Sequence, residues 1–257
     1  MASFFGIQTW FHRDVAQLSG GQKQLLNLAS VMVMQPDLLL LDEPTSQLDP
    51  IAASDFLATL GKINRELGTT ILLTEHRLEE ALPLASRAAV LDGGRLLCAG
   101  TPREVGAQLK SRGHAMFLAM PTPMRVWAAV ENNAPCPITV REGREWLAGF
   151  GASHTWNDLP PEPGHIPYGA AAVQADGLWF RYERDQPDVV KGLSLTVRKG
   201  ELLALLGGNG TGKTTSLKLA AGLLKPVRGK VSAQGTVGVL PQSPQTLFLK
   251  KTVREDL

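Results

Sequence analysis

Cysteine is scarce in this sequence. Only Cys98 and Cys136 occur, far apart and without a Cys-x-x-Cys spacing. This scarcity argues against a disulfide scaffold and against a structural zinc site. It is typical of a protein that works in the reducing cytosol.

Long hydrophobic runs are also missing. The longest extend over only a few residues, as from Leu38 to Leu41, whereas a membrane-spanning helix needs about 20 apolar residues. The N-terminus, MASFFGIQTWFHRD, has no basic start followed by a sustained apolar run, so no signal peptide is expected. The sequence therefore predicts a soluble, intracellular chain.

An excess of charge of either sign is absent. Lysine and arginine number 26 against 24 aspartates and glutamates, for a net charge of +2. This balance favours neither a nucleic-acid-binding protein nor a protein held at a membrane by charge. With 257 residues, of which 44% are hydrophobic, the chain can form one large domain or two modest ones.

Hydrophobic periodicity over residues 1–110 predicts alternating helices and strands, the pattern of an α/β layer structure. A helix should follow Gly20-Gly21 and end at Pro36-Asp37. Further helices are expected at 51–67 and 77–86, and another begins at the capped TPRE of Thr101. LLLLDE and TTILLTEH read as strands buried on both faces, and AAVLDGGRLLCAG reads as a hairpin.

The composition and the hydrophobic periodicity of the sequence change at residue 111. Prolines cluster between 111 and 172 and periodicity fades, apart from a helix expected near 141–150, so this region is interpreted as a connector. Its tryptophans, Trp127, Trp146 and Trp156, indicate that it packs on something. From residue 173 strands resume as LWFRY, LSLTV and ELLALLG, and a helix is predicted over 212–222.

The stretch GGNGTGKTT contains a phosphate-binding loop. Gly207 to Thr214 fits GxxxxGK followed by Ser or Thr, in which glycines let backbone N–H groups turn toward a phosphate. Lys213 would bridge the β- and γ-phosphate oxygens, and the Thr214 hydroxyl would bind Mg²⁺. The preceding apolar run and the following helix supply the context that the pattern requires.

Two carboxylates end the predicted strand LLLLDEP. Asp42 could hold Mg²⁺, and Glu43 could polarise an attacking water. For these two residues alone, a pair of acids that caps a helix is an equal alternative. TEH ends the next strand in the same way and brings His76 to the same sheet edge. A lone histidine is usually structural, but beside Glu43 a contact with the γ-phosphate is the better interpretation.

With LSGGQ, LLLLDEPTSQLDP, TEH and GGNGTGKTT together, the sequence resembles the ATP-binding cassette (ABC) ATPases over residues 1–110 and 173–257. The wording LSGGQKQLLNLAS, TSQLDP and VLPQSPQTLF is most like the ATPases of energy-coupling-factor (ECF) transporters. The resemblance implies a P-loop NTPase fold, α/β with a mixed sheet flanked by helices. It also implies ATP and Mg²⁺ as cofactors.

The resemblance implies roles for individual residues. Leu18 to Gln22 match the signature, Asp42 and Glu43 the Walker B pair, and Ser46 to Asp49 the D-loop. His76 matches the switch histidine, and Glu43 and His76 would be catalytic. The metal would be held by Asp42, Thr214 and Gln242, the last of which is the Q-loop glutamine. Tyr182 matches the aromatic that stacks on adenine, with Phe180 and Trp179 as close alternatives. The implied nucleotide contacts are Ser19, Gly20, Gly21, Gln22, Asp49, Tyr182, Gly207, Asn209, Gly210, Thr211, Gly212, Lys213, Thr214, Thr215 and Gln242.

The order of these motifs departs from the family, in which Walker A and the Q-loop precede the signature. We interpret residues 1–110 as the C-terminal half of a first cassette, 111–172 as the connector and 173–257 as the N-terminal half of a second cassette. In the family two cassettes pair head to tail, so Ser19 would face the Walker A loop at Lys213. A circular permutant, in which both halves form one cassette, is the alternative.

The resemblance implies an ATPase that drives an ECF-type importer of vitamins or metal ions. Its partners would be a second cassette and membrane-embedded subunits at the cytoplasmic face of the cell membrane, with no nucleic acid. The alternatives are a soluble tandem ABC ATPase that acts on the ribosome or DNA, and a catalytically inactive truncated product. The sequence does not specify the transported solute.

Overall fold

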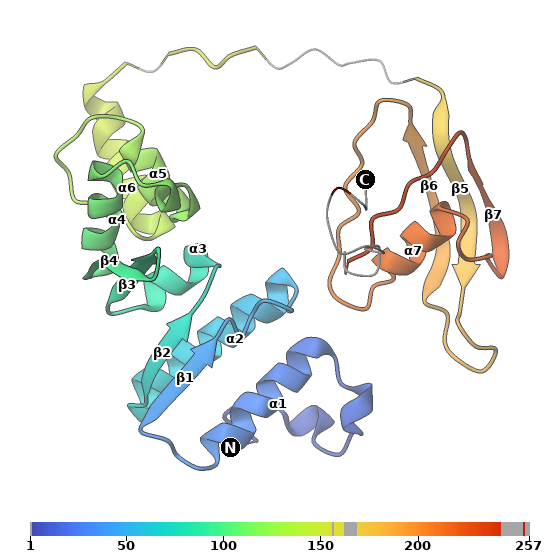
Figure 1. The fold of residues 1–257 in the computed structure, drawn as a ribbon, viewed down its shortest axis with the longest axis horizontal. Helices are drawn as coiled ribbons and strands as arrows, with labels where there is room; N and C mark the ends of the chain where they lie inside the picture. The colour runs from blue at the N-terminus through green and yellow to red at the C-terminus, as the bar shows by residue number, and fades with distance from the viewer. Residues whose placement is uncertain (1, 156, 162–168, 243–253, 255–257) are drawn as a thin grey trace. The chain divides into compact units, whose positions relative to one another are not determined.

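The computed structural model describes residues 2–155, 157–161, 169–242 and 254. The chain divides into two compact units, Met1–Pro161 and Glu162–Leu257, and Figure 1 shows that each has its own helices and strands. Trp156 and the end of the 239–248 stretch lie outside the described residues. Within these described ranges, no helix is both long and apolar enough to cross a membrane.

The first layer of unit 1 packs two helices on a parallel pair of strands. Its elements are η1 (Gln8–Trp10), η2 (Val15–Gln17), α1 (Gly20–Met32), β1 (Leu38–Asp42), α2 (Pro50–Lys62), the π-helical turn η3 (Ile63–Leu67) and β2 (Thr70–Thr74). The predicted helices and strands here are confirmed. The elements enclose a core that comprises Phe5, Ile7, Leu28, Ala29, Met32, Leu39, Leu48, Ala53, Phe56, Leu57, Leu60 and Ile63.

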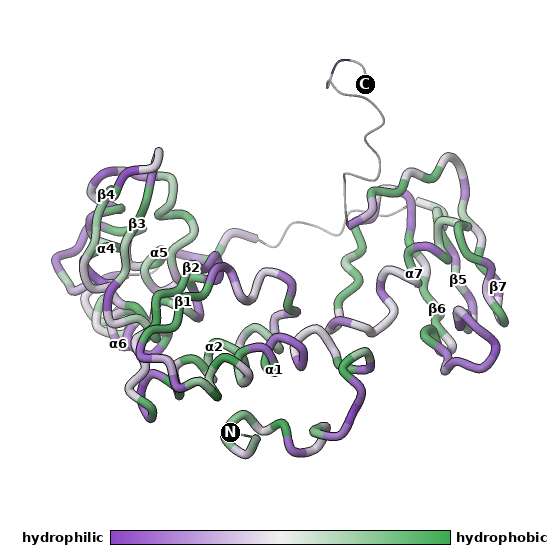
Figure 2. Tube along the Cα trace, turned by 60° about the horizontal axis from the view of Figure 1, so that its bottom comes forward, coloured by the Kyte–Doolittle hydropathy of each residue, from purple (hydrophilic) through white to green (hydrophobic). Residues whose placement is uncertain are grey.

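The prediction that β1 and β2 are buried on both faces is wrong for unit 1. Leu39 points into the core and is 5% exposed, whereas Leu40 is 65% exposed and Leu72 is 63% exposed. Successive side chains of a strand point to opposite faces, so one face of this pair carries leucines without cover from unit 1. Figure 2 shows the two strands as predominantly hydrophobic.

The next elements are short. They are α3 (Leu78–Ala81), η4 (Leu82–Leu84) and the antiparallel strands β3 (Ala88–Asp92) and β4 (Arg95–Gly100). The helix predicted over 77–86 is interrupted because Pro83 cannot continue the α-helical hydrogen-bond pattern. The predicted hairpin is confirmed, and its turn residues Gly93 and Gly94 have φ values of 54° and 74°, which glycine adopts without strain.

Much of the region read as a connector is folded onto unit 1. Helices α4 (Pro102–Ser111), η5 (Ala115–Ala119), α5 (Thr122–Ala128) and α6 (Val140–Ser153) follow the hairpin, and α6 confirms the helix expected near 141–150. Trp127 is buried at 7% exposure and donates its indole N–H to the Ala134 carbonyl over 3.0 Å. Trp146 packs on the same core. We name 102–153 the helical subdomain.

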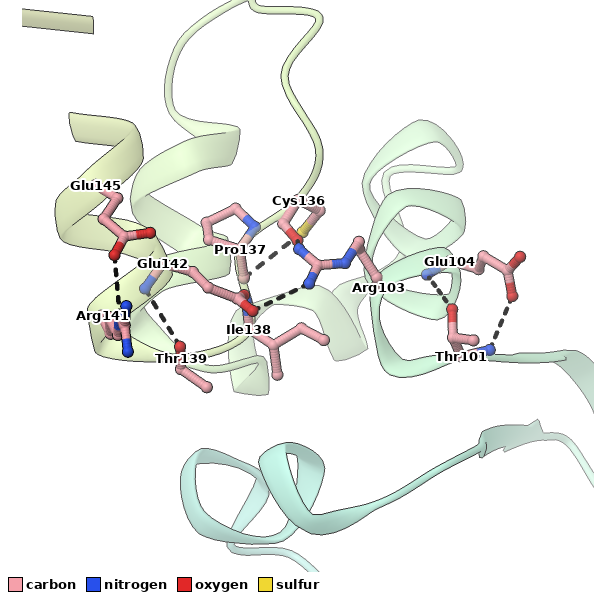
Figure 3. A network of polar contacts seen from close by, with 10 residues as sticks. All are labelled: Thr101, Arg103, Glu104, Cys136, Pro137, Ile138, Thr139, Arg141, Glu142 and Glu145. Atoms are coloured by element: carbon pink, nitrogen blue, oxygen red, sulfur yellow. Dashed lines mark hydrogen bonds and ion pairs between the residues drawn. The ribbon is translucent and has the colours of Figure 1, made fainter. Parts of the chain in front are cut away.

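A polar network joins α4 to α6 within the helical subdomain (Figure 3). The Arg103 guanidinium donates to the Cys136 carbonyl and, over 3.1 Å, to the Glu142 carboxylate. The other Glu142 oxygen accepts from the Ile138 amide at 2.7 Å. This backbone hydrogen bond, followed by the contact with Arg103, holds the pKa of Glu142 below its usual value.

The described residues of unit 2 form a three-stranded antiparallel sheet on which the helix α7 packs. Its elements are β5 (Ala171–Phe180), β6 (Val190–Arg198), α7 (Lys213–Ala220) and β7 (Arg228–Ala233), and the strand order is β6-β5-β7. Leu219 of α7 completes a small core with Ala175, Leu178, Phe180 and Val190. The strands at LWFRY and LSLTV and the helix over 212–222 are confirmed, whereas β7 was not predicted.

The strand predicted at ELLALLG is wrong for unit 2. Residues 201–207 have no regular secondary structure, and Leu202 and Leu206 are 91% and 87% exposed. A strand exists only through hydrogen bonds to a neighbouring strand, and no described strand of unit 2 pairs with this segment. Its apolar side chains therefore lie without cover from their own unit.

We predict that Glu142→Gln lowers the free energy of unfolding of the chain and makes this free energy less dependent on pH. Because the folded-state pKa of Glu142 is lowered from 4.5, its contribution is present above that pH and is lost as pH falls through the folded pKa. The carboxylate is 37% exposed, so solvent screening limits the expected loss in free energy of unfolding to roughly 0.5–1 kcal/mol.

Urea unfolding followed by circular dichroism, above and below pH 4.5, measures this effect. The matched control is Glu145→Gln on the same helix, whose partner Arg141 is 88% exposed. Equal pH dependence in the Glu142 and Glu145 variants would contradict the assignment.

Candidate functional site

The parallel pairing of β1 and β2 gathers polar side chains at one sheet edge. Asp42 is aligned with Thr74, and the Thr74 hydroxyl donates to Asp42 Oδ1 over 2.7 Å. The same hydroxyl accepts from the Glu43 amide at 3.0 Å. His76 Nε2 lies 2.7 Å from Glu43 Oε1. Unit 1 thus brings Asp42, Glu43 and His76 together, as the sequence predicts.

Glu43 and His76 form an open pair. The side chains are 45% and 75% exposed, so a ligand can reach both. Glu43 has a φ of +43°, in the left-handed region that disfavours residues with a Cβ atom. Strained backbone of this kind at a ligand-accessible carboxylate is typical of functional sites.

The turn after Glu43 leads directly into α2. Thr45 is fully buried, and Asp49 Oδ1 accepts from the amides of Ile51 and Ala52 at 3.1 and 3.0 Å. Asp49 therefore caps α2. The predicted contact of Asp49 with a nucleotide stays a prediction.

The signature segment forms the start of α1. The Ser19 hydroxyl accepts from the Gln22 amide at 3.2 Å, and the Gln22 side chain accepts from the Ser19 amide at 2.9 Å. This capping box leaves the positive end of the helix dipole at Ser19 and Gly20, where anions bind favourably.

The two glycines of the signature differ in their surroundings. A Cβ atom added at Gly21 would lie 2.8 Å from the Cβ of Ala52, so Gly21 permits close packing of α1 on α2. A Cβ at Gly20 would meet nothing within 4 Å. The absence of a side chain at Gly20 therefore has no packing explanation within unit 1, as expected of a position that a ligand approaches.

Glycines of the predicted phosphate loop in unit 2 have left-handed backbone conformations. Gly210 and Gly212 have φ values of 78° and 90°, and a Cβ at Gly212 would lie 2.9 Å from the Val189 carbonyl. Lys213 Nζ donates to the carbonyls of Gly207 and Gly208 at 2.8 and 2.6 Å, so its ammonium lies over the loop. Thr214, the second residue of α7, is exposed.

Tyr182 is the most accessible of the aromatic residues considered for adenine. It is 55% exposed, while Phe180 is 7% exposed and belongs to the core. The Tyr182 hydroxyl lies 3.0 Å from Thr215 Oγ1 in α7, which ties the ring to the helix that follows the phosphate loop. Exposure and this contact favour Tyr182 over Phe180 for stacking.

The candidate residues fall into two groups, one in each unit. Unit 1 holds Ser19, Gly20, Gly21, Gln22, Asp42, Glu43, Asp49 and His76, and unit 2 holds Tyr182, Gly207 to Thr215 and Gln242. Across the described ranges, no group of three or more His, Cys, Asp or Glu side chains could hold a metal. The carboxylate, hydroxyl and amide oxygens of Asp42, Thr214 and Gln242 are nevertheless the hard donors that suit Mg²⁺.

Sequence reasoning did not single out Thr45, Thr74, Glu75 and Arg77. All four contact the turns that carry Glu43 and His76. Their position within LLLLDEPT and TEHR was a signal, since they directly neighbour the candidate catalytic residues.

Comparison with known families finds a match in both units. The family model described as "ABC transporter" matches residues 2–46 and 190–256, which include the signature, the Walker B pair and the phosphate loop.

Relatives extend the match across both units. A Bacillus cereus protein provisionally named an ABC transporter ATP-binding protein is 44% identical over 241 residues, covering 92% of this chain and 42% of its own. A Bacillus subtilis protein provisionally named an HMP/thiamine import ATP-binding protein is 30% identical, covering 95% of this chain and 45% of its own. The chain thus spans less than half the length of these two curated relatives.

A solved structure matches over nearly the whole chain. The archaeal ribosome recycling factor aABCE1, in complex with the stalk protein aP1, has a TM-score of 0.57 and 21% identity over 94% of this chain and 41% of its own. At this identity the likeness concerns the fold alone. The fold is that of a P-loop ABC ATPase, mixed α/β, and the family match falls in two segments. In sequence, the chain is similar to ABC transporter ATP-binding proteins across both units.

We predict that Glu43→Gly gives a more stable chain than Glu43→Ala. Both variants lose the contact with His76, so their difference isolates the backbone. The positive φ of Glu43 costs alanine about 1–2 kcal/mol, which exceeds the roughly 0.5–1 kcal/mol of extra chain entropy that glycine loses on folding. Glycine should therefore be favoured by about 0.5–1 kcal/mol in urea unfolding.

The control is the same pair of substitutions at Glu79, which lies in helix α3. Alanine should be the more stable variant there, as in helices generally. If alanine were the more stable variant at position 43 as well, Glu43 would not be held in a left-handed conformation.

Proposed function

We propose that this chain supplies ATP-binding and ATP-hydrolysing residues to an ECF-type ABC importer of vitamins or metal ions. The observation that carries the proposal is the 2.7 Å pair of Glu43 and His76 at the sheet edge that also bears Asp42. The phosphate loop of unit 2, with Lys213, adds the residues that would bind the phosphates of a nucleotide. The 30% identity to a protein named for HMP/thiamine import supports the ECF assignment.

The proposal includes two half-cassettes, with unit 1 as the C-terminal half of a first cassette and unit 2 as the N-terminal half of a second. Each unit leaves apolar side chains uncovered, Leu40 and Leu72 in unit 1 and Leu202 and Leu206 in unit 2, as expected of halves that lack a layer. The relatives match 92–95% of this chain within proteins more than twice as long. A shared motif order in longer relatives favours a tandem protein over a circular permutant.

In this arrangement the two groups of residues serve different nucleotides. Tyr182 stacks on adenine, the amides of the phosphate loop and Lys213 bind the phosphates, and Thr214 and Gln242 hold the Mg²⁺ of that site. The bound Mg²⁺ neutralises charge on the phosphates. Ser19 and Gly20, at the start of α1, approach the γ-phosphate of the same nucleotide from the first cassette.

Glu43 and His76 act on the nucleotide of the first cassette. As the water oxygen bonds to the γ-phosphorus, the bond to the bridging oxygen of ADP breaks, and the Glu43 carboxylate accepts the proton that water loses. His76, within hydrogen-bond distance of Glu43, orients that carboxylate and reaches the γ-phosphate. The proposed partners are a second cassette, paired head to tail, and membrane-embedded subunits at the cytoplasmic face of the cell membrane.

We predict that the 257-residue chain alone shows little or no ATPase activity. Lys213 and Glu43 serve different composite sites in the proposed arrangement, so neither site is complete in one chain. Phosphate release by the purified monomer at neutral pH measures this. Mg²⁺-dependent turnover that is abolished by both Lys213→Ala and Glu43→Gln would instead support the circular permutant.

We predict that Ser19 and the phosphate loop lie across one nucleotide in the longer two-cassette protein. Ser19→Cys and Thr211→Cys, in a background with Cys98→Ala and Cys136→Ala, should crosslink through a short bifunctional reagent when ATP is bound. A direct disulfide needs Cα atoms within about 7 Å, so the reagent allows for the intervening phosphate.

The control replaces Ser19→Cys with Glu43→Cys in the same background. Efficient ATP-dependent crosslinking of position 43 to position 211 within one chain, without crosslinking of position 19, would show that one cassette contains both halves.

A further inference from the structure

The segment that follows β2 makes four polar contacts with the turns next to Glu43 and His76. Glu75 Oε2 accepts from the Thr45 hydroxyl at 2.6 Å. Glu75 Oε1 accepts from the amides of His76 and Arg77 at 2.8 and 3.1 Å. The Arg77 guanidinium donates to the Leu48 carbonyl over 3.1 Å. We name these contacts the Glu75–Arg77 clamp.

The clamp joins the two turns that carry the catalytic pair. Thr45 is fully buried and lies two residues after Glu43, within a turn closed by the hydrogen bond from the Ser46 amide to the Glu43 carbonyl. His76 directly follows Glu75. One oxygen of the Glu75 carboxylate therefore binds the Thr45 side chain in the turn after Glu43, and the other binds the backbone at His76.

The catalytic pair needs such support. Its side chains are 45% and 75% exposed, and exposed charged pairs hold their geometry weakly because solvent competes for both groups. The hydrogen bond between Glu75 and Thr45 is partly buried and charge-assisted, which makes it the stronger constraint.

A helix-capping role explains only part of this arrangement. Acceptance from the His76 and Arg77 amides resembles an N-terminal cap of α3, which spans only Leu78–Ala81. Such a cap needs neither the contact with Thr45 nor the reach of Arg77 to Leu48, the residue before Asp49. These two contacts lead to the turn between the Walker B strand and α2.

We propose that Glu75 is a positioning residue for the Glu43–His76 pair and that Arg77 extends this support to the Ser46–Asp49 turn. The inference rests on the proposed function, since it assigns a role in hydrolysis to the pair. Glu75 acts through Thr45 and the His76 backbone and has no contact of its own with the nucleotide. Loss of its carboxylate lowers turnover by displacing Glu43 and His76.

The first arm of the test uses the 257-residue chain and does not depend on hydrolysis. Glu75→Ala should raise the amide hydrogen-exchange rates of His76 and Arg77 by about tenfold or more, because both amides lose their acceptor. Glu75→Gln keeps an acceptor oxygen and an amide group that can donate to Thr45, so exchange should stay close to that of the unsubstituted chain. Unchanged exchange in the alanine variant would overturn the clamp.

The matched control is Glu79→Ala. Glu79 of α3 makes a similar contact with a threonine, since it accepts from the Thr122 amide at 2.8 Å. That threonine belongs to the helical subdomain and not to the turns of the catalytic pair. Its loss should leave the His76 and Arg77 amides unaffected.

The second arm measures ATP hydrolysis by the longer two-cassette protein. Glu75→Ala should lower kcat by about tenfold to a hundredfold with KM unchanged, since misplacement of reacting groups by about 1 Å has effects of this size. Glu75→Gln should retain most of the rate, and Glu79→Ala all of it. Thr45→Val provides a second route to the same defect if the alanine variant folds poorly.

Combination with Glu43→Gln separates positioning from general damage. If Glu75 acts through Glu43, the double variant Glu75→Ala, Glu43→Gln should be no slower than Glu43→Gln alone. Multiplying defects, or a kcat equal to that of the Glu79 control, would overturn the inference while leaving the proposed function intact. Absence of any effect of Glu43→Gln would overturn the proposed function, and the inference would fall with it.

Discussion

The register of one parallel strand pair governs both the core and the site of unit 1. Leu38 to Asp42 align one to one with Thr70 to Thr74, so both strands end at the same edge with Asp42 beside Thr74. A slip of one residue would turn Leu39 out of the core and Leu40 into it. It would also separate the Thr74 hydroxyl from Asp42 and the Glu43 amide. Burial of Leu39 therefore stabilises the same alignment that assembles the polar edge.

Helix starts add a second constraint, because several of them combine a structural and a chemical role. Ser19 closes a capping box at α1, and Asp49 caps α2. Both residues are polar for reasons that hold without any ligand. Only the surroundings of a residue distinguish a structural role from a chemical one. Gly20 faces open space, whereas Gly21 packs against Ala52. A motif can thus contain adjacent residues that are required for different physical reasons.

Local signals allowed much of the fold to be predicted from sequence. The Thr101 capping box, the Gly93-Gly94 turn and the α1 pattern each depend on residues within a few positions of one another. Features that depend on distant neighbours were missed or wrong. These include the open face at Leu40, the loss of strand structure at Leu202 and the helices η5 and α5 in the region interpreted as a connector. In the site, motif wording indicated Glu43 and His76, but the contacts of Glu75 follow only from the folded turn.

The uncovered leucines have a consequence for how such a chain behaves during synthesis. Unit 1 leaves the ribosome before unit 2, with Leu40 and Leu72 on a sheet face that its own helices leave uncovered. The segment at Leu202 and Leu206 emerges later with unpaired backbone and apolar side chains. Surfaces of this kind attract strands of other molecules. Until such surfaces are covered, they favour aggregation while a chain is being made.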